Sequence, residues 1–305
     1  MSQSRLDRFG TRRTEVNDRD IAGILTPLSI YRYQPTSFLA AWSGRSRKVI
    51  NQRARLLKRR PNCYIGVAEH EHNFLYKEDF YYLDENGYNA LGISREHGES
   101  RSQHFNHRVM VDTAVASLDM GAAAAGARVL LPQELRAHPR FKPDDPRHPF
   151  AFKVTIAHDF ETGRDARETF YVPDAVRGYQ LAAGYFFIKL EAETGENRIE
   201  PMSGGLKPTS FLKKFLCDQF IFSNELYKTQ WGMPSLLTLV VTPNQARIAT
   251  MKELILRLTN GKGSKHVLFH TFPTLTTKGE KVLPMPELFT DPWQRAGHPD
   301  FSFTA

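Results

Sequence analysis

A basic segment without any acidic residue, at positions 43–62, limits most strongly how this chain folds. Eight Lys/Arg residues lie between Arg45 and Arg60, and the apolar residues among them recur at helical spacing. This spacing predicts a helix over 46–58 with one apolar side and one basic side. The apolar side must pack against neighbouring helices, and it consists of Val49, Ile50, Ala54, Leu56 and Leu57.

Two further helices are predicted before this segment. The first begins at Asp18 as N-cap, and Pro27 argues against its running on unbroken. The second is short and is entered by Thr36 or Ser37. Gly44 then provides the turn into the basic helix. We therefore expect three short helices in succession.

A hairpin is predicted after the basic helix. Two β-rich runs, 63–68 and 74–83, flank the polar turn EHEHN, and a short closing helix follows. Three helices followed by a hairpin are typical of a winged helix-turn-helix. We predict such a domain over 18–92, preceded by a flexible basic arm over 1–17.

Positive charge is concentrated at this end of the chain. The 305 residues have a formal net charge of +8, and residues 1–60 contain 14 Lys/Arg against 4 Asp/Glu. The rest of the chain is therefore close to neutral. A concentration of this kind favours a polyanionic partner, and we expect double-stranded DNA.

The third helix of a helix-turn-helix enters the major groove, where Arg reads guanine and Asn reads adenine. We expect residues near the start of the basic helix to reach base edges and those at its end to contact phosphate. The alternative is a basic surface helix without a specific ligand. The expected base contacts are Arg47, Lys48, Asn51 and Arg55, and the other predicted DNA-binding residues are Arg45, Lys58, Arg59 and Arg60.

A second domain is predicted over 106–275, after a polar linker over 93–105. A helix ending at Gly126 begins it, and a Pro-rich irregular tail over 276–305 follows it. The strands expected within it before a long amphipathic segment are 150–157, 168–174 and 185–193. A strand, a helix and a last strand complete the domain. The predicted fold class is therefore α/β (α+β), with a mixed sheet flanked by helices.

Acidic residues mark the ends of two of these strands. Glu191 and Glu193 share one strand face, because residues i and i+2 point the same way, and a neighbouring strand would bring Asp174 beside them. Converging carboxylates repel one another unless a divalent cation neutralises them. We therefore predict Asp174, Glu191 and Glu193 as ligands of Mg²⁺ or Mn²⁺, which would activate a water molecule. The alternative is solvated acids at a surface strand end.

This arrangement resembles that of the PD-(D/E)xK nucleases, which also place a lysine near the attacking water. Its usual position, two residues after the second acid, is Glu193 in this chain. Lys189 precedes the acids on the same strand face, and Lys213 and Lys214 lie on the following helix. Glu134 is a candidate for an additional acid. The restriction-endonuclease-like fold of these enzymes is what the resemblance implies for the second domain.

The two cysteines, Cys63 and Cys217, lie far apart and lack metal-ligand spacing, which fits a reducing cytosol. No secretory signal is expected, because the first residues contain no apolar region. No apolar run reaches the roughly 18 residues of a membrane span. We therefore expect a cytoplasmic protein without a membrane partner.

Taken together, the two halves resemble the replication-relaxation family of plasmid and mobile-element proteins. The resemblance implies a winged helix joined to a nuclease-like domain that acts in DNA replication or mobilisation, with Asp174, Glu191 and Glu193 as an acidic site. It rests on DIAGILTPLSIYRY, the Arg-rich helix, YYLDENGYNALG, His107, VPDAV, FFIKLEAETG and the helix of Lys213 and Lys214.

Three functions remain open at this point. The first is a DNA-binding protein of a mobile element, acting in replication, mobilisation or transcriptional control. The second is a metal-dependent endonuclease or nickase, and the third is a regulator or assembly factor with an inactive nuclease-like domain. A homodimer or other mobile-element proteins are possible partners, although no coiled-coil heptad is present to supply a dimer.

Overall fold

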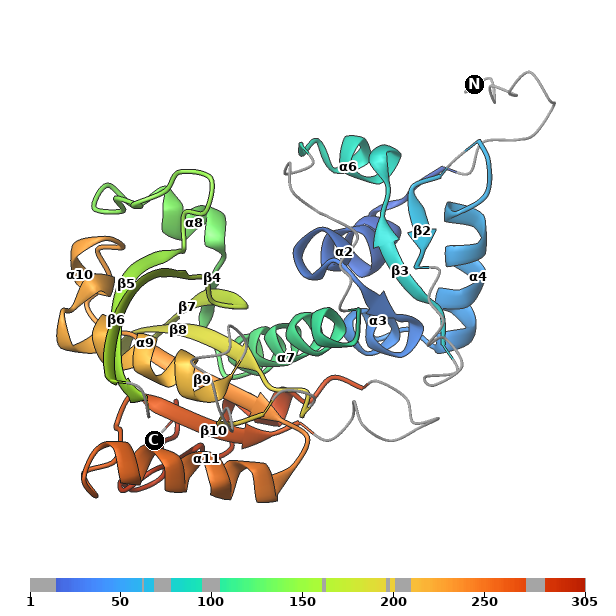
Figure 1. Ribbon diagram of the computed structural model, residues 1–305. Helices are drawn as coiled ribbons and strands as arrows, with labels where there is room; N and C mark the ends of the chain where they lie inside the picture. Colours follow the sequence, from blue (N-terminus) through green and yellow to red (C-terminus); the bar gives the residue numbers. More distant parts are fainter. Residues whose placement is uncertain are drawn as a thin grey trace, which may run out of the picture. The chain divides into compact units, whose positions relative to one another are not determined.

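The computed structural model describes residues 15–61, 63–68, 78–94, 105–160, 163–195, 198–200, 210–272 and 283–304. The chain divides into two compact units, which we call unit 1 (Met1–Ala116 with Thr274–Pro284) and unit 2 (Ser117–Pro273 with Met285–Ala305). Both combine helices with strands (Figure 1), which confirms the predicted mixed α/β class. Most of the predicted arm over 1–17, most of the predicted linker over 93–105 and the first part of the tail lie outside the described residues.

Unit 1 contains a cluster of helices and a small sheet. Its described elements are α1 (Asp18–Asp20), the π-helical turn η1 (Ile21–Leu25), α2 (Thr26–Tyr31), β1 (Gln34–Pro35), α3 (Thr36–Ser43), α4 (Arg47–Leu57), β2 (Ile65–Val67), β3 (Phe80–Leu83), α6 (Glu85–Leu91) and the first part of α7 (Phe105–Ala124).

The first helical stretch runs without a break from α1 through α2. Asn17 caps it, one residue before the predicted cap: its Oδ1 accepts from the N–H of Asp20 at 2.9 Å, and the Asp20 carboxylate accepts from the N–H of Asn17 at 3.3 Å. The π-helical turn η1 lies directly before Pro27, and in it the N–H of Thr26 donates to the carbonyl of Ile21, five residues back. The wider turn accommodates the proline ring, so the helical stretch continues where a break was predicted.

The turn between α3 and α4 is the one predicted. Gly44 has a φ of 66° and its N–H donates to carbonyls of the last turn of α3. Ser46 then caps α4, since its side-chain oxygen accepts from the N–H of Val49 at 3.4 Å. The local sequence therefore fixes both the end of α3 and the start of α4.

The sheet of unit 1 has the strand order β1-β3-β2, and its neighbouring strands are antiparallel. Ile65 pairs with Leu83, as the predicted hairpin requires, while the expected turn at 69–73 and the first residues of the second predicted strand, 74–77, lie outside the described residues. Gly66 faces the ring of Tyr82, where a Cβ atom would lie 2.1 Å from the ring carbon Cζ. Glycine thus allows the two strands to pair beside this tyrosine.

The core of unit 1 joins α4 to the preceding helices and the sheet. Burial of each large apolar side chain contributes roughly 1.5–3 kcal/mol, so this core determines which side of α4 faces inward. Its fully buried members include Ile24, Leu25, Leu28, Phe38, Leu39, Ile50, Ala54, Leu57 and Phe80.

Unit 2 is built on a larger mixed sheet with the strand order β11-β10-β9-β8-β7-β4. Strands β4, β7 and β8 are antiparallel neighbours, whereas β8, β9 and β10 are parallel. The described elements are β4 (Arg128–Leu130), α8 (Pro132–Arg136), β5 (Phe152–Phe160), β6 (Gly163–Tyr171), β7 (Ala175–Leu181), β8 (Gly184–Ala192), α9 (Phe211–Ser223), α10 (Leu226–Thr229), β9 (Leu237–Thr242), α11 (Gln245–Leu258), β10 (Val267–Thr271), the 3-10 helix η3 (Pro286–Phe289) and β11 (Gln294–Arg295).

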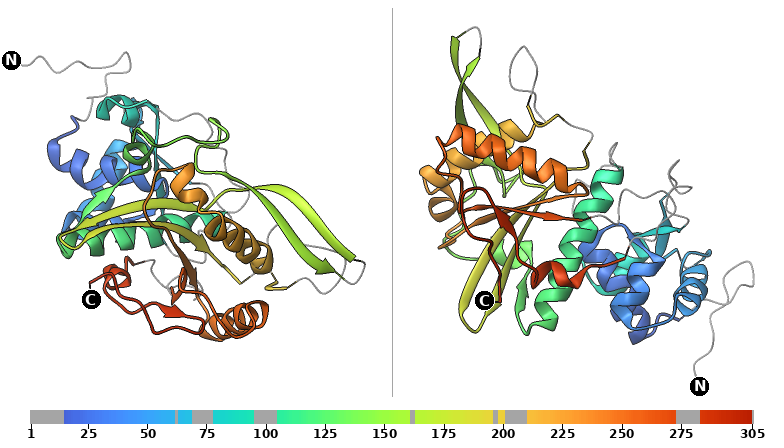
Figure 2. Two further views of the ribbon diagram at one scale, coloured as in Figure 1. Left: turned by 90° about the vertical axis from the view of Figure 1, so that its left-hand side faces the viewer. Right: turned by 90° about the horizontal axis from the view of Figure 1, so that it is seen from below.

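Helices α9 and α11 cover one face of this sheet (Figure 2), where Phe211 and Ile255 share a core cluster with Phe269 of β10. Strands β5 and β6 form a separate antiparallel hairpin, and its inner side chains, such as Val154, pack against Cys217 of α9. Helix α9 therefore lies between the main sheet and the hairpin.

Strand β7 was not predicted. It follows Asp174 directly, the residue at which a predicted strand ended. Arg177 and Gly178 interrupt the apolar alternation of β7, so its pattern does not indicate a strand. A Cβ atom at Gly178 would lie 3.1 Å from the side chain of Leu130, so a larger residue there would need Leu130 to shift slightly.

The C-terminal segment is more ordered than the predicted irregular tail over 276–305. It contributes the edge strand β11, and Phe289 and Trp293 are fully buried in unit 2. Trp293 Nε1 donates to the carbonyl of Leu288 at 2.9 Å. Because β11 is only two residues long and Pro residues surround it, the sequence carries no strand signal there.

Candidate nucleic-acid interface and acidic cluster

The side of α4 that faces away from the core is set by its buried residues. Ile50, Ala54 and Leu57 are fully buried, and the opposite positions are exposed. These exposed positions follow one another at intervals of four, three and four residues, which places them on one helix face. We call this the outer face of α4; it consists of Lys48, Gln52 and Arg55, together with Arg59, which lies two residues beyond the end of the helix.

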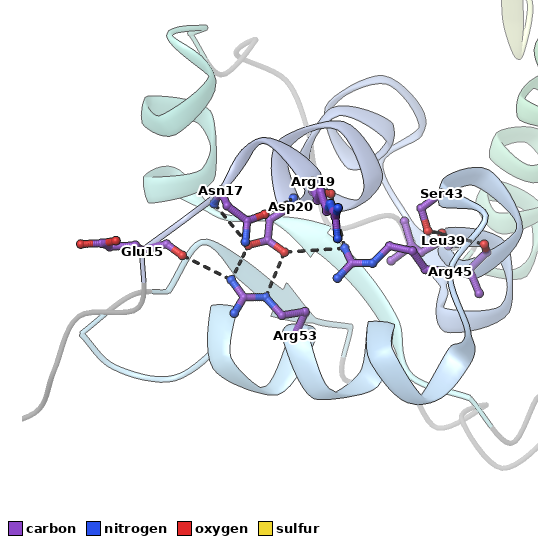
Figure 3. A network of polar contacts seen from close by, with 9 residues as sticks. Glu15, Asn17, Arg19, Asp20, Leu39, Ser43, Arg45 and Arg53 are labelled. Atoms are coloured by element: carbon purple, nitrogen blue, oxygen red, sulfur yellow. Dashed lines mark hydrogen bonds and ion pairs between the residues drawn. The ribbon is translucent and has the colours of Figure 1, made fainter.

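One flank of α4 is tied to a buried carboxylate of the first helical stretch (Figure 3). Asp20 is fully buried and accepts from Nε of Arg53 at 2.9 Å, while Nη2 of Arg53 contacts its second oxygen. Nη1 of Arg45 lies 3.8 Å from the same carboxylate. Arg53 also donates to the carbonyl of Glu15 at 3.3 Å. This flank therefore holds α4 in place.

The other flank is tied to Glu78, whose side chain is 2% exposed. Its Oε2 accepts from the N–H of Ser37 at 3.0 Å, and its Oε1 pairs with Nη2 of Arg47. Burial of a carboxylate destabilises the fold unless a cation or a hydrogen-bond donor contacts it. The Arg47 guanidinium and the N–H of Ser37 provide these two partners for Glu78.

Two of the predicted DNA contacts thus have acidic partners within unit 1. Arg45 and Arg47 were expected to face DNA on a helix whose charge has no internal partner, but both pair with carboxylates of unit 1. The partners come from outside the helix, Asp20 from 25 residues upstream of Arg45 and Glu78 from 31 residues beyond Arg47. The basic segment contains no acid, yet the fold brings acids to it.

Two neutral residues of α4 also differ from expectation. Asn51 is half-buried, and its Oδ1 accepts from the hydroxyl of Thr36 at 2.9 Å, so the oxygen that would read adenine is already engaged. Val49 was assigned to the apolar side, but it is 38% exposed. Both shifts mean that the inward side of α4 is centred closer to Ile50 and Ala54 than the wheel predicted.

The remaining predicted DNA-binding residues are exposed. Within the described part of the chain, no carboxylate lies at ion-pair distance from any of them. Gln52 lies among them and was missed, although a wheel centred on Ile50 and Leu57 would have identified it. The exposed cations are Lys48, Arg55, Lys58, Arg59 and Arg60.

The predicted acids of unit 2 do come together. Strand pairing aligns Ala175 with Leu190, which places Asp174 beside the end of β8, and Asp174 Oδ2 accepts from the N–H of Ala192 at 2.9 Å. Glu191 and Glu193 lie on one strand face, and both contact the same lysine. We call these three residues, with the cations around them, the acidic cluster.

The cations come from the two helices that cover the sheet. Lys214 Nζ lies 2.9 Å from Glu191 Oε2 and 2.9 Å from Glu193 Oε1, so it bridges the two carboxylates. Ser210 caps α9 just before it. Arg247, in the first turn of α11, lies 3.1 Å from Glu193 Oε2. Lys214 was predicted as a site residue, whereas Arg247 was not, because the sequence offers no local signal for it.

A second lysine lies deeper. Lys189 is fully buried and lies 2.7 Å from Asp218 of α9 and 3.8 Å from Glu191. It also donates to the hydroxyl of Tyr171, which in turn donates to Glu191. Asp218 was missed as well, although it follows Lys214 by four residues and therefore shares its helix face.

Neighbouring charges and burial shift the pKa values of the acids in opposite directions. Burial and the neighbouring Glu191 raise the pKa of Asp174 to about 7. Burial alone would raise the pKa of Glu191, but Lys214 and Lys189 outweigh it and hold that pKa below its usual value. Burial would lower the pKa of Lys214, yet the three carboxylates raise it well above its usual value. Asp174 is thus the member that exchanges a proton near neutral pH.

The acidic cluster does not fit a divalent cation in this arrangement. The oxygens of Glu191 accept from Tyr171 and Lys214, and those of Glu193 from Lys214 and Arg247. The ammonium of Lys214 lies between the carboxylates, where a metal ion would need to bind. No group of three potential metal ligands occurs among the residues described. The chain's own cations therefore offset the repulsion that had suggested Mg²⁺ or Mn²⁺.

Two other predicted site residues lie apart from the acidic cluster. Lys213 points elsewhere and lies 3.4 Å from the hydroxyl of Thr169. Glu134 pairs with Arg128 at 2.6 Å and accepts from the N–H of Leu131 at 2.9 Å, which makes it a capping residue of α8. Neither is brought to the three acids by the contacts that the structure shows.

Comparisons with known protein families, with curated proteins and with solved structures found no match. None of the helices in the described ranges is long and apolar enough to span a membrane.

Proposed function

We propose that this chain binds double-stranded DNA through the outer face of α4, and that unit 1 acts as a winged helix-turn-helix. One observation carries the proposal. Arginines on the flanks of α4 are neutralised by Asp20 and Glu78, whereas the outer face keeps its cations exposed to solvent. Phosphates would supply negative charge to these exposed cations.

The order of elements supports the same proposal. Helices α2, α3 and α4 precede the antiparallel pair β2 and β3, and this order supports α4 as the recognition helix. We further propose that the chain belongs with the replication-relaxation proteins, and that it acts on DNA of a plasmid or another mobile element in replication, mobilisation or transcriptional control.

Salt dependence of duplex binding tests the proposal. The logarithm of the affinity should fall linearly with the logarithm of salt concentration, with a slope of about −0.9 for each phosphate contacted. The variant Lys48→Ala/Arg55→Ala/Arg59→Ala should lose affinity and flatten the slope by up to about 2.7. The control Lys142→Ala/Lys262→Ala/Lys265→Ala removes equal charge from exposed positions in unit 2 and should leave the slope unchanged. Equal effects of both triple variants would overturn the proposal.

DNA cleavage at the acidic cluster is a second candidate function. It is favoured by the convergence of Asp174, Glu191, Glu193 and Lys214 at one sheet edge. Nicking of supercoiled DNA, assayed with and without Mg²⁺, should then disappear in Asp174→Ala and Lys214→Ala. It should persist in Glu134→Ala, which leaves the acidic cluster intact. If the purified chain does not nick DNA, the neutralised acidic cluster supports the regulator with an inactive nuclease-like domain.

A further inference from the structure

We infer that Gln52 and Arg55 are the base-reading residues of α4, and that the bound site contains an adenine and a guanine close together. The inference rests on the proposed DNA binding and specifies what that site recognises. Gln52 replaces Asn51 as the expected adenine contact, and Arg55 replaces Arg47 as the principal guanine contact.

Burial selects these two side chains. At about 100° per residue, Lys48, Gln52, Arg55 and Arg59 fall within about 60° of arc, directly opposite the fully buried Ile50 and Leu57. Lys48 lies in the first turn of α4 and Arg59 lies beyond its last residue, Leu57, so Gln52 and Arg55 are the members of this face that follow the first turn and precede the end of the helix. A helix that enters the major groove with this face presents them to the floor of the groove.

The chemistry of the two side chains fits base edges. A glutamine amide donates to adenine N7 and accepts from adenine N6, and an arginine fork donates to guanine O6 and N7. Each contact requires that both polar groups of the side chain are available to the base. Asn51 has its oxygen engaged by Thr36, and one nitrogen of Arg47 is held by Glu78, so neither is arranged for bidentate reading.

The distance between the two side chains limits the motif. Residues three apart on a helix are separated by about 4.5 Å along its axis. Successive base pairs are about 3.4 Å apart. Gln52 and Arg55 therefore reach neighbouring or next-neighbouring base pairs, which places the adenine and the guanine within about three base pairs of each other. Lys58, Arg59 and Arg60, at the end of the helix, remain phosphate contacts.

Selection of bound duplexes from a random library, carried out with the full chain, tests this inference. The wild-type protein should yield a motif containing both bases. Gln52→Ala should lose the adenine preference, by roughly 5- to 150-fold, and keep the guanine. Gln52→Glu should shift that position toward cytosine, whose N4 amino group donates to a carboxylate. Arg55→Lys should weaken the guanine preference and leave the adenine.

Two matched controls separate specificity from general binding. Gln133→Ala removes an exposed glutamine from α8 and should leave the motif unchanged. Lys58→Ala should lower affinity for all sequences alike and flatten the salt dependence by about 0.9. A wild-type motif that Gln52→Ala leaves intact, or salt-dependent binding without any motif, overturns this inference while the proposed DNA binding stands. Absence of binding to any duplex overturns both.

Discussion

The outer face of α4 and the acidic cluster of unit 2 differ in whether their charged side chains have partners within the chain. The cations of the outer face are exposed, and no carboxylate of the described residues lies at ion-pair distance from them. In the acidic cluster, each oxygen of Glu191 and Glu193 accepts from a cation or a hydroxyl group of the same chain. A run of like charges therefore becomes a candidate binding site only after its internal partners have been located.

The largest loss of stability that we expect from this comparison is caused by replacing Lys189. Replacing it by Met should destabilise unit 2 by about 3–5 kcal/mol, because Asp218 would remain buried without its cation and Glu191 would keep only Lys214. Urea unfolding measures the loss. Lys265→Met, at an exposed position, should change little. The double variant Lys189→Met/Asp218→Asn should recover much of the stability, and equal losses in the single and double variants would show that the pair is not the cause.

The contrast also shows what the sequence can predict. Caps such as Ser46 and Gly44 act within a few residues, so the bounds of α4 are predictable from the sequence. The convergence of Asp174 with Glu191 follows from strand pairing, and it too was expected. The ion pair between Asp20 and Arg53 spans 33 residues and appears in no periodicity. The charge of a segment is local information, whereas its compensation depends on the tertiary fold.

The next effect concerns the compensated flank of α4. Asp20→Asn keeps an acceptor for the N–H of Asn17 but removes the charge that Arg45 and Arg53 share. We expect a loss of about 2–3 kcal/mol, less than for Lys189, because the arginines are partly exposed and regain water. Hydrogen exchange of the α4 amides should accelerate accordingly.

Asp18→Asn is the matched control for Asp20→Asn, since it removes the same charge from an exposed position of the same helix. It should leave hydrogen exchange in α4 unchanged. Unaltered protection in Asp20→Asn would show that the two arginines do not anchor α4, and the distinction between its flanks and its outer face would then fail.

A smaller effect concerns pH and Asp174. Its folded pKa of about 7 lies above the usual value of 3.8, so the stability that it contributes is complete below about pH 4 and is lost as the pH rises to 7. Asp174→Asn should therefore gain stability relative to wild type between pH 4 and pH 8. Urea unfolding at both pH values measures this difference. Asp300→Asn, at an exposed position, should show none, and a parallel response of Asp174→Asn and wild type would contradict the assignment.

The smallest expected effect is a substitution at Lys48 that should change stability and DNA affinity in opposite directions. The first turn of α4 contains Arg47 and Lys48 and no acid, although the helix dipole favours acids there. Lys48→Glu should therefore stabilise unit 1 by about 0.3–1 kcal/mol and yet weaken DNA binding. Lys58→Glu, at the C-cap of the same helix, should weaken binding similarly but cost about as much stability as the first variant gains. If Lys48→Glu raised the stability of unit 1 but left the affinity for DNA unchanged, the result would show that Lys48 does not contact DNA.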